Sequence, residues 1–106
     1  MSHFSTVKTE LRQRESLVSA LEDLGYEPKQ GGHPVRGYRG QTVEAELAVT
    51  LQDSADFGFV WNEANGAYEF VTDLDLWRQS MPIERFLSRL TQRYALNTVL
   101  KASLTE

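Results

Sequence analysis

The fold is decided by the stretch VEAELAVTLQDSADFGFVWNEANGAYEFV, residues 43–71. Its first nine residues, 43–51, place apolar side chains at the odd positions, and most even positions are polar or small. This period of two predicts a β-strand with one buried face, and Glu44 and Glu46 mark the face that meets water. A strand covered on one face favours an antiparallel sheet over a parallel sheet covered on both faces.

The rest of the same stretch predicts a β-hairpin. Aromatic residues recur at two-residue spacing over residues 57–61, and strand-like residues resume over residues 68–71. Between the two runs lie Asn65 and Gly66, a pair that tolerates the positive φ angles of tight turns. Two strands joined by a short turn are therefore expected here.

Two helices are predicted, one on each side of this region. Over residues 11–24 the apolar side chains recur at three- and four-residue steps, and Gly25 is expected to end that helix. A second helix is expected over residues 83–94 on the same periodicity. Ser80 is a candidate cap for this second helix, with Pro82 near its first turn.

The remaining segments have weaker patterns. Residues 3–9 mix β-branched and aromatic side chains and are interpreted as a short strand. Residues 27–34 contain two prolines and two glycines, which predict a loop. A short helical turn is expected within residues 73–79, and past Asn97 the pattern fits either more helix or a further strand.

These elements predict an α+β fold, a single antiparallel sheet of four to five strands with two main helices packed on one face. With 106 residues, 41% of them hydrophobic, we expect a single domain over residues 1–106. No apolar run approaches the length that spans a bilayer, and the N-terminus lacks a signal-peptide pattern, so an intracellular soluble protein is expected. The formal net charge of −4 argues against dedicated nucleic-acid binding, which needs a basic surface.

Groups that could carry chemistry are few. The chain has no cysteine, which excludes disulfides and thiolate chemistry, and its two histidines are far apart. A metal centre needs three or four ligands, so we expect no metal and no cofactor. Carboxylate pairs occur at Glu44 and Glu46 and at Asp73 and Asp75, but a solvated strand face and a turn explain them as well as acid–base catalysis does. No catalytic residue is assigned.

The first candidate for recognition is the segment RGYRG, residues 36–40. Flexible glycines bring backbone close to the guanidinium groups of Arg36 and Arg39, with Tyr38 between them. Because arginine forms paired hydrogen bonds to carboxylate or phosphate, these residues could bind an anion or an acidic protein. The alternative is a strand end with ordinary solvent-facing arginines.

Two further candidates lie in the second half of the chain. Arg85, Arg89 and Arg93 are each four residues apart and therefore share one face of the predicted final helix. That face is either simply solvated or a docking surface for an acidic partner. Trp61 and Trp77, in the hairpin and at its exit, are candidates for a binding hot spot, with core packing as the alternative.

Four segments together resemble a known family: MSHFSTVKTELRQRESLVSALEDLGY, VRGYRGQTVEAEL, GFVWNEANGAYEFVTDLDLW and FLSRLTQRYALNTVL. Across almost the whole chain, the sequence is similar to the family of hypothetical chloroplast reading frame 35, found in cyanobacteria and plastids and classed as a domain of unknown function. Members of that family often continue beyond the position of Glu106. The resemblance implies a photosynthetic context, in a cyanobacterial cytoplasm or a plastid stroma, and brings no catalytic site with it.

Together, these observations favour a non-enzymatic accessory or assembly protein of photosynthetic organisms, or of their viruses. It would act by binding another protein that has an acidic surface. A small-ligand or anion-binding module built on residues 36–39 is the alternative, and an enzyme that uses carboxylates alone is a further one. An open sheet edge would also permit homo-oligomers.

Overall fold

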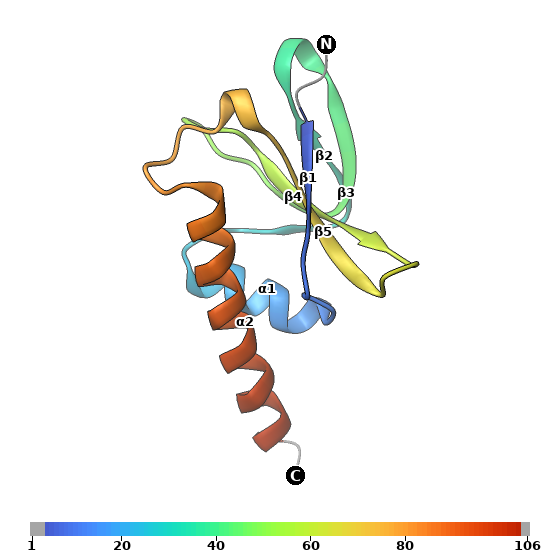
Figure 1. Cartoon of the computed structure of the whole chain (residues 1–106), viewed down its shortest axis with the longest axis vertical. Helices are drawn as coiled ribbons and strands as arrows, with labels where there is room; N and C mark the ends of the chain where they lie inside the picture. Colours follow the sequence, from blue (N-terminus) through green and yellow to red (C-terminus); the bar gives the residue numbers. More distant parts are fainter. Residues whose placement is uncertain (1–3, 105–106) are drawn as a thin grey trace.

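The computed structural model describes residues 4–104 and confirms the α+β fold. One sheet holds five strands in the order β1-β5-β4-β3-β2, and every neighbouring pair is antiparallel. The strands are β1 (Phe4–Lys8), β2 (Lys29–Arg36), β3 (Thr42–Val49), β4 (Phe57–Asn62) and β5 (Ala67–Asp73). The helices α1 (Arg14–Asp23) and α2 (Ile83–Leu104) pack against one face of the sheet (Figure 1), and the short 3₁₀ turns are η1 (Tyr38–Gly40) and η2 (Leu74–Leu76).

The main core lies between the two helices and the sheet. α1 contributes Leu17 and Leu21, and α2 contributes Phe86 and Leu90. These side chains meet an aromatic group centred on Phe57, whose ring centroid lies 5.0–6.2 Å from those of five neighbouring rings. The rings meet edge-on or tilted, as their quadrupoles favour, so the aromatic residues of the predicted hairpin form the centre of this core.

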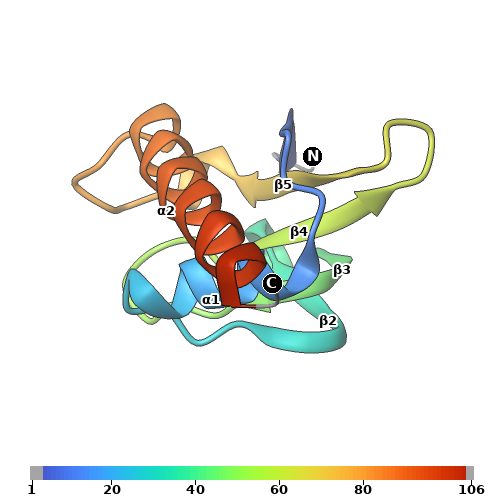
Figure 2. The same cartoon turned by 90° about the horizontal axis from the view of Figure 1, so that it is seen from below.

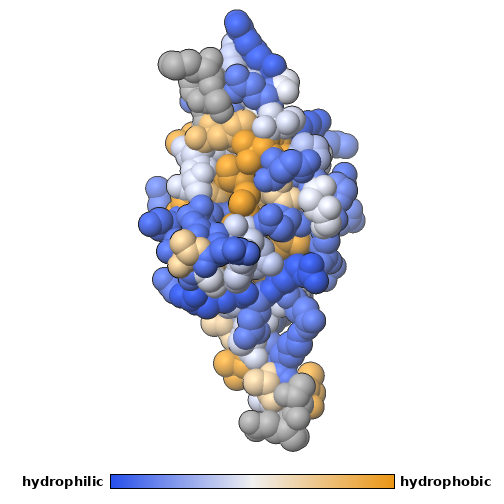
Figure 3. All heavy atoms as spheres, turned by 90° about the vertical axis from the view of Figure 1, so that its right-hand side faces the viewer, coloured by the Kyte–Doolittle hydropathy of each residue, from blue (hydrophilic) through white to orange (hydrophobic). Residues whose placement is uncertain are grey.

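A second, smaller core fills the opposite face of the sheet. Its buried side chains are Val35, Ala45, Ala48 and Val71. Gly58 lets β2 and β3 approach this face, because a Cβ atom there would lie 2.6 Å from Val35 Cγ2 and 2.8 Å from Ala45 Cβ. Figure 3, viewed from the side away from α2, shows an apolar patch among hydrophilic surroundings.

The alternating residues 43–51 are divided between the two cores. We expected all their odd positions to share one core, but Leu47 and Val49 reach the main core whereas Ala45 lies in the second. The physical reason is the register shift in the pairing of β2 with β3, which lies between Gln30 and His33, opposite the segment between Leu47 and Ala45. A bulge of this kind bends and twists the strands locally. Glu44 and Glu46 are exposed, as expected.

The prediction of a loop at residues 27–34 is wrong, because most of them belong to β2. Gly31 and Gly32, with φ of 92° and 86°, lie where the register of β2 against β3 shifts. A bulge of this kind needs the left-handed backbone that glycine adopts without strain. Pro34 is tolerated because β2 is an edge strand, where a missing N–H need not break the sheet.

The other strand and turn predictions are confirmed with shifted bounds. The strand expected at residues 3–9 is β1, although His3 lies outside the described residues. The hairpin is formed by β4 and β5, which are joined by residues 63–66, and Gly66 supplies a positive φ of 63°. The helical turn expected after residue 73 is η2.

Both predicted helices are confirmed. Gly25 follows α1 with φ of 94°. The first intrahelical bond of α2 runs from the Phe86 N–H to the Pro82 carbonyl at 3.0 Å, so Pro82 takes the cap position that we expected for Ser80. Past Asn97 the chain stays helical, which settles the choice between helix and strand.

The long α2 gives the molecule its elongated shape, with principal extents of 49 × 31 × 21 Å. Figure 1 shows its last turns projecting beyond the sheet, and Figure 2 shows it crossing α1. Among residues 4–104, no helix has the length and apolar character needed to cross a membrane.

Candidate functional site

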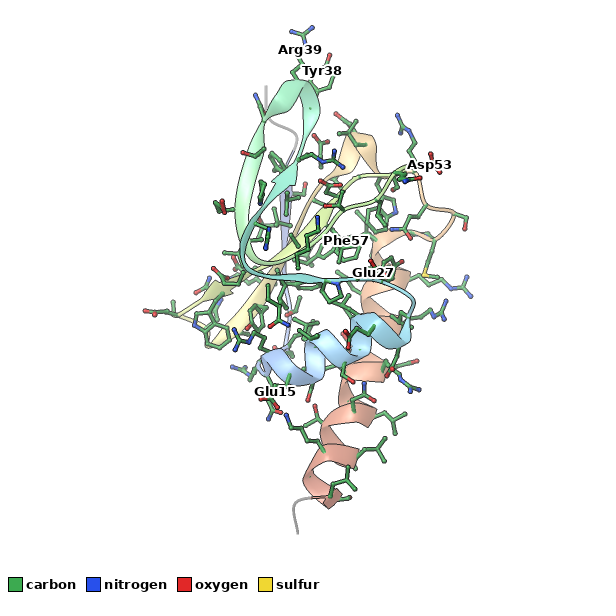
Figure 4. The ribbon with its side chains drawn as sticks, turned by 180° about the vertical axis from the view of Figure 1, so that it is seen from behind. Glu15, Glu27, Tyr38, Arg39, Asp53 and Phe57 are labelled. Carbon is green, nitrogen blue, oxygen red and sulfur yellow. The ribbon has the colours of Figure 1, made fainter. Side chains whose placement is uncertain are left out.

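The residues that the sequence marks for recognition lie at three separate places. Arg36, Tyr38 and Arg39 lie at the outer end of the β2–β3 hairpin, away from both helices (Figure 4). The three arginines of the final helix lie on α2, and the two tryptophans lie on β4 and after η2. The structure therefore does not bring the predicted residues together into one site.

The hairpin end is held by Asp56, a carboxylate that is only 3% exposed. It accepts two hydrogen bonds from the guanidinium of Arg36, from Nε at 2.7 Å and from Nη2 at 3.0 Å. The backbone N–H groups of Arg36 and Leu51 donate to the same carboxylate at 3.1 and 3.2 Å. Burial acts to raise the pKa of Asp56, but these hydrogen bonds outweigh it and lower the pKa below its ordinary value.

A second buried carboxylate, Asp73, holds the same loop from β5. It accepts hydrogen bonds from the backbone N–H groups of Tyr38 and Asp75, both at 3.0 Å. Gly37 makes this close approach possible, since a Cβ atom there would lie 2.5 Å from Phe4 Cζ. Two carboxylates, one just before β4 and one at the end of β5, therefore fix the path of residues 36–40.

At the tip of this loop, Arg39 and Tyr38 point outward (Figure 4). Among the described residues Arg39 is the only non-glycine with a positive φ, at 56°. Its guanidinium carbon lies 5.2 Å from the centre of the Tyr38 ring, within cation–π range. The loop thus displays a cation and an aromatic ring, while the guanidinium of Arg36 is already bonded to Asp56.

On α2 the three predicted arginines are all exposed and share one face. Arg93 Nε donates to Asp23 Oδ2 at 2.7 Å, and Asn97 Nδ2 donates to the same oxygen at 2.9 Å. The hydrogen bond from Asn97, followed by that from Arg93, lowers the pKa of Asp23. Within residues 4–104, Arg85 and Arg89 form no ion pair.

Further contacts also tie α2 to α1 and to the chain just before α1. The Tyr94 hydroxyl accepts hydrogen bonds from the N–H groups of Arg12 and Gln13 at 2.9 and 2.8 Å. Near the end of α2, Lys101 forms an ion pair with Glu15 of α1. Together with the ion pair of Arg93 and Asp23, these contacts hold α2 on α1, and the side chains of Arg85 and Arg89 remain exposed.

The sequence reasoning missed a group of apolar side chains on the last turns of α2. Leu96, Val99, Leu100 and Leu104 are 46%, 64%, 50% and 86% exposed. They were missed because the pattern past Asn97 left helix and strand open. The four-residue spacing of the three leucines was the available signal, since it places them on one side of a helix.

The two tryptophans have different environments. Trp77 is partly buried and packs against the main core, with its ring centre 5.8 Å from that of Phe86, and its indole N–H donates to the Met81 carbonyl at 2.9 Å. Trp61 is partly exposed and packs edge-on against Tyr68 with ring centres 5.0 Å apart. Of the pair, Trp61 has the more accessible ring.

Carboxylates and histidines do not gather into a metal site within the described part of the chain. Glu44 and Glu46 lie on the exposed side of β3, where Glu46 accepts a hydrogen bond from the Trp61 backbone N–H. Of the other predicted carboxylate pair, Asp73 is fully buried whereas Asp75 is exposed. Neither pair therefore places two carboxylates together in a buried pocket.

Fold and surface together define a small α+β protein that displays arginines on a long helix and at a rigid hairpin tip. The chain belongs to the family described as "Protein of unknown function (DUF1257)", whose model matches residues 20–106. It is 41% identical over 101 residues to "Uncharacterized protein ycf35" of Guillardia theta, covering 95% of this chain and 77% of that one.

Two further relatives carry the same name. The ycf35 protein of Cyanophora paradoxa is 29% identical over 106 residues, covering 100% of this chain and 81% of the relative. That of Pyropia yezoensis is 29% identical over 101 residues, covering 95% and 77%. These relatives are encoded in plastid genomes, which confirms the resemblance to the family of hypothetical chloroplast reading frame 35. No solved structure matches the chain.

Proposed function

We propose that this protein is a non-enzymatic accessory or assembly protein that binds another protein through the arginine face of α2. The observation that carries the proposal is the pair Arg85 and Arg89, two exposed guanidinium groups that form no ion pair with residues 4–104. They lie on a rigid helix in a chain whose formal net charge is −4.

A local patch of positive charge on an acidic protein favours binding to a partner that has an acidic patch. A partner with an acidic patch is attracted to the arginine face, whereas the net negative charge of the chain disfavours its approach in other orientations. Guanidinium groups also form paired hydrogen bonds to carboxylates, which add geometric specificity. Arg93 contributes less to this attraction because Asp23 already neutralises it.

The plastid-encoded relatives support a setting in photosynthetic organisms, in the plastid stroma or the cyanobacterial cytoplasm. The test is therefore affinity capture from a stromal extract at low salt, with the full chain as bait. Arg85→Glu with Arg89→Glu should lose the captured protein. Arg14→Glu with Lys29→Glu, an equal charge change at exposed positions of α1 and β2, should retain it. Failure of the wild-type chain to retain any protein would contradict the proposal.

Anion binding at the hairpin tip is the second candidate function. The observation that favours it is the backbone of Arg39, since a left-handed arginine costs free energy and such outliers cluster at functional sites. Arg39 and Tyr38 would supply the contacts, because the Arg36 guanidinium is already bonded to Asp56.

Thermal unfolding with inorganic phosphate separates this candidate from protein docking. A ligand that binds only the folded state raises the melting temperature by mass action. The rise should be present in the wild-type chain and absent in Arg39→Gln. A melting temperature that phosphate leaves unchanged in the wild-type chain would eliminate this candidate.

A further inference from the structure

One ridge of exposed side chains runs along α2 from its first turn to its last. Its members are separated by steps of four, four, three, four and four residues, and all are exposed: Arg85, Arg89, Arg93, Leu96, Leu100 and Leu104. Residues three or four apart lie on the same side of a helix. The ridge is therefore basic over the first half of α2 and apolar over the second half.

The apolar half projects from the molecule. Figure 1 shows the last turns of α2 beyond the sheet, and Figure 3 shows apolar atoms around the chain end at the bottom of the view. The ion pair of Lys101 with Glu15 and the hydrogen bond from Asn97 to Ser19, at 3.1 Å, hold these turns on α1, and Leu100 and Leu104 border the groove between the two helices. The three leucines nevertheless remain exposed, and exposed apolar patches of this kind mark interaction surfaces.

We propose that this ridge docks an amphipathic helix of a partner protein. The partner helix places carboxylates opposite Arg85 and Arg89 and apolar side chains opposite Leu96 and Leu100. Its length is about 19 residues, because α2 from residue 85 to 104 is roughly 29 Å long at the usual rise per residue. This inference rests on the protein-binding function proposed above and specifies the chemistry of the partner.

Charge complementarity selects a different chain over a second copy of this one. Two copies joined by a two-fold axis across the ridge would run antiparallel and would place arginines against leucines. Parallel copies would place arginine against arginine, and like charges in contact repel. An acidic partner helix satisfies both halves of the ridge, because it brings the carboxylates that the ridge lacks.

The test is selection from a display library of helical peptides of about 20 residues on the full-length chain. One face of each peptide varies among Asp, Glu, Lys, Arg, Leu and Ser. Selected peptides should carry Asp or Glu toward one end of that face and Leu toward the other. Affinity is then measured by fluorescence anisotropy with the best peptide.

Two paired variants separate the halves of the ridge. Arg85→Glu with Arg89→Glu should lower the affinity for the selected peptide roughly tenfold or more. When the library is applied to this variant, it should select basic peptides. Leu96→Gln with Leu100→Gln should lower the affinity for the original peptide to a similar extent. The control pair, Arg14→Glu with Lys29→Glu, should leave the affinity unchanged. Circular dichroism checks that each variant keeps its helices.

Several results would overturn the proposal. One is selection of peptides without the acidic-to-apolar order, and another is equal affinity of the wild-type chain and both ridge variants. A dimer in light scattering that Leu96→Gln with Leu100→Gln dissociates would assign the ridge to a second copy. Ridge-dependent binding to phosphatidylglycerol vesicles, with no peptide selected, would assign it to a membrane surface.

The two experiments distinguish failure of the proposed partner chemistry from failure of the proposed protein-binding function. If capture from the extract depends on Arg85 and Arg89 but no acidic amphipathic helix is selected, protein binding stands and this partner chemistry is wrong. If the extract yields no bound protein, the docking function is wrong.

Discussion

Asp56 does more for the candidate site than its place in the sequence suggests. It stands just before β4 with no motif around it, yet its carboxylate accepts both hydrogen bonds of the Arg36 fork and two backbone N–H groups. Asp56 therefore connects the Arg36 side chain with the backbone at Arg36 and at Leu51. The path of the displayed loop therefore depends on a buried carboxylate outside the loop itself.

Replacing this carboxylate should destabilise the fold. Asp56→Asn removes the charge opposite Arg36 and places an amide nitrogen, a donor, where two donors now point. We expect the free energy of unfolding to fall by about 1–3 kcal/mol, less than for a pair with both partners buried. Urea unfolding at neutral pH measures the change. A loss below about 0.5 kcal/mol, typical of surface substitutions, would show that the ion pair is dispensable.

The difference in unfolding free energy between the wild-type chain and Asp56→Asn should become smaller as the pH is lowered. The folded pKa of Asp56 lies below its ordinary value because its hydrogen bonds outweigh the effect of burial. Its stabilising effect is therefore fully present above about pH 4, the unfolded pKa, and is lost as the pH falls through the folded pKa. The gap between the wild-type chain and Asp56→Asn should narrow under acid, and a gap that widens would contradict this assignment.

Substitutions of Arg39 test whether its left-handed backbone conformation lowers the stability of the fold. At φ of 56° a side chain collides with its own backbone, whereas glycine adopts the conformation freely. Arg39→Gly should therefore leave stability unchanged or raise it by up to about 1 kcal/mol, even though glycine adds entropy to the unfolded chain. Urea unfolding measures this, with Arg39→Ala as the control that keeps the strain. A clear loss of stability in Arg39→Gly would mean that the side chain supports the fold.

At the scale of elements, α2 is a helix with two different halves. Its first half buries Phe86 and Leu90 in the main core, whereas its second half exposes Leu96 and Leu100. A helix stabilised by core packing along its whole length would bury one continuous stripe. The second half is held instead by polar contacts with α1.

This division predicts unequal effects of equal substitutions. Leu90→Ala should cost about 2–5 kcal/mol of unfolding free energy, because it opens a cavity in the main core. Leu100→Ala should cost less than about 0.5 kcal/mol, because the side chain is half exposed and alanine keeps helix propensity. Chemical denaturation of both variants gives the comparison. Similar losses would mean that Leu100 is buried in solution by a contact within the chain or by a second copy.

Sequence patterns succeeded where an element's structure is set by its own residues. Residues 43–51 showed β3 because one face meets water, and the spacing of Arg85, Arg89 and Arg93 gave a shared helix face because helix geometry is local. β2 was missed because the glycines and proline that punctuate it are tolerated only through its edge position and its bulge.

The candidate sites were predictable to a smaller extent, because charge pairing is tertiary. The ion pair of Arg36 with Asp56 joins residues 20 positions apart, and that of Arg93 with Asp23 joins residues 70 positions apart. Spacing alone could not show which arginines are neutralised in this way. It could also not show that Trp77 packs against the main core while Trp61 remains more exposed.

At the scale of the whole molecule, the two cores share their strands. In β5 the neighbouring residues Phe70 and Val71 point to opposite faces, Phe70 into the main core and Val71 into the second. β3 likewise contributes Leu47 to one core and Ala48 to the other. Neither core can lose its strands while the other keeps them, so we propose that the chain is one cooperative domain.

Cooperative unfolding can be tested with a substitution in the second core and a fluorescence probe in contact with the main core. Val71→Ala should lower the free energy of unfolding by about 1–3 kcal/mol, because it empties a buried site. In a Trp61→Phe background, Trp77 is the remaining tryptophan and its fluorescence follows the main core. If the domain is cooperative, the fluorescence midpoint in urea shifts as far as the midpoint measured by circular dichroism. A Trp77 midpoint that stays in place while circular dichroism shows an earlier transition would mean that the two faces of the sheet unfold separately.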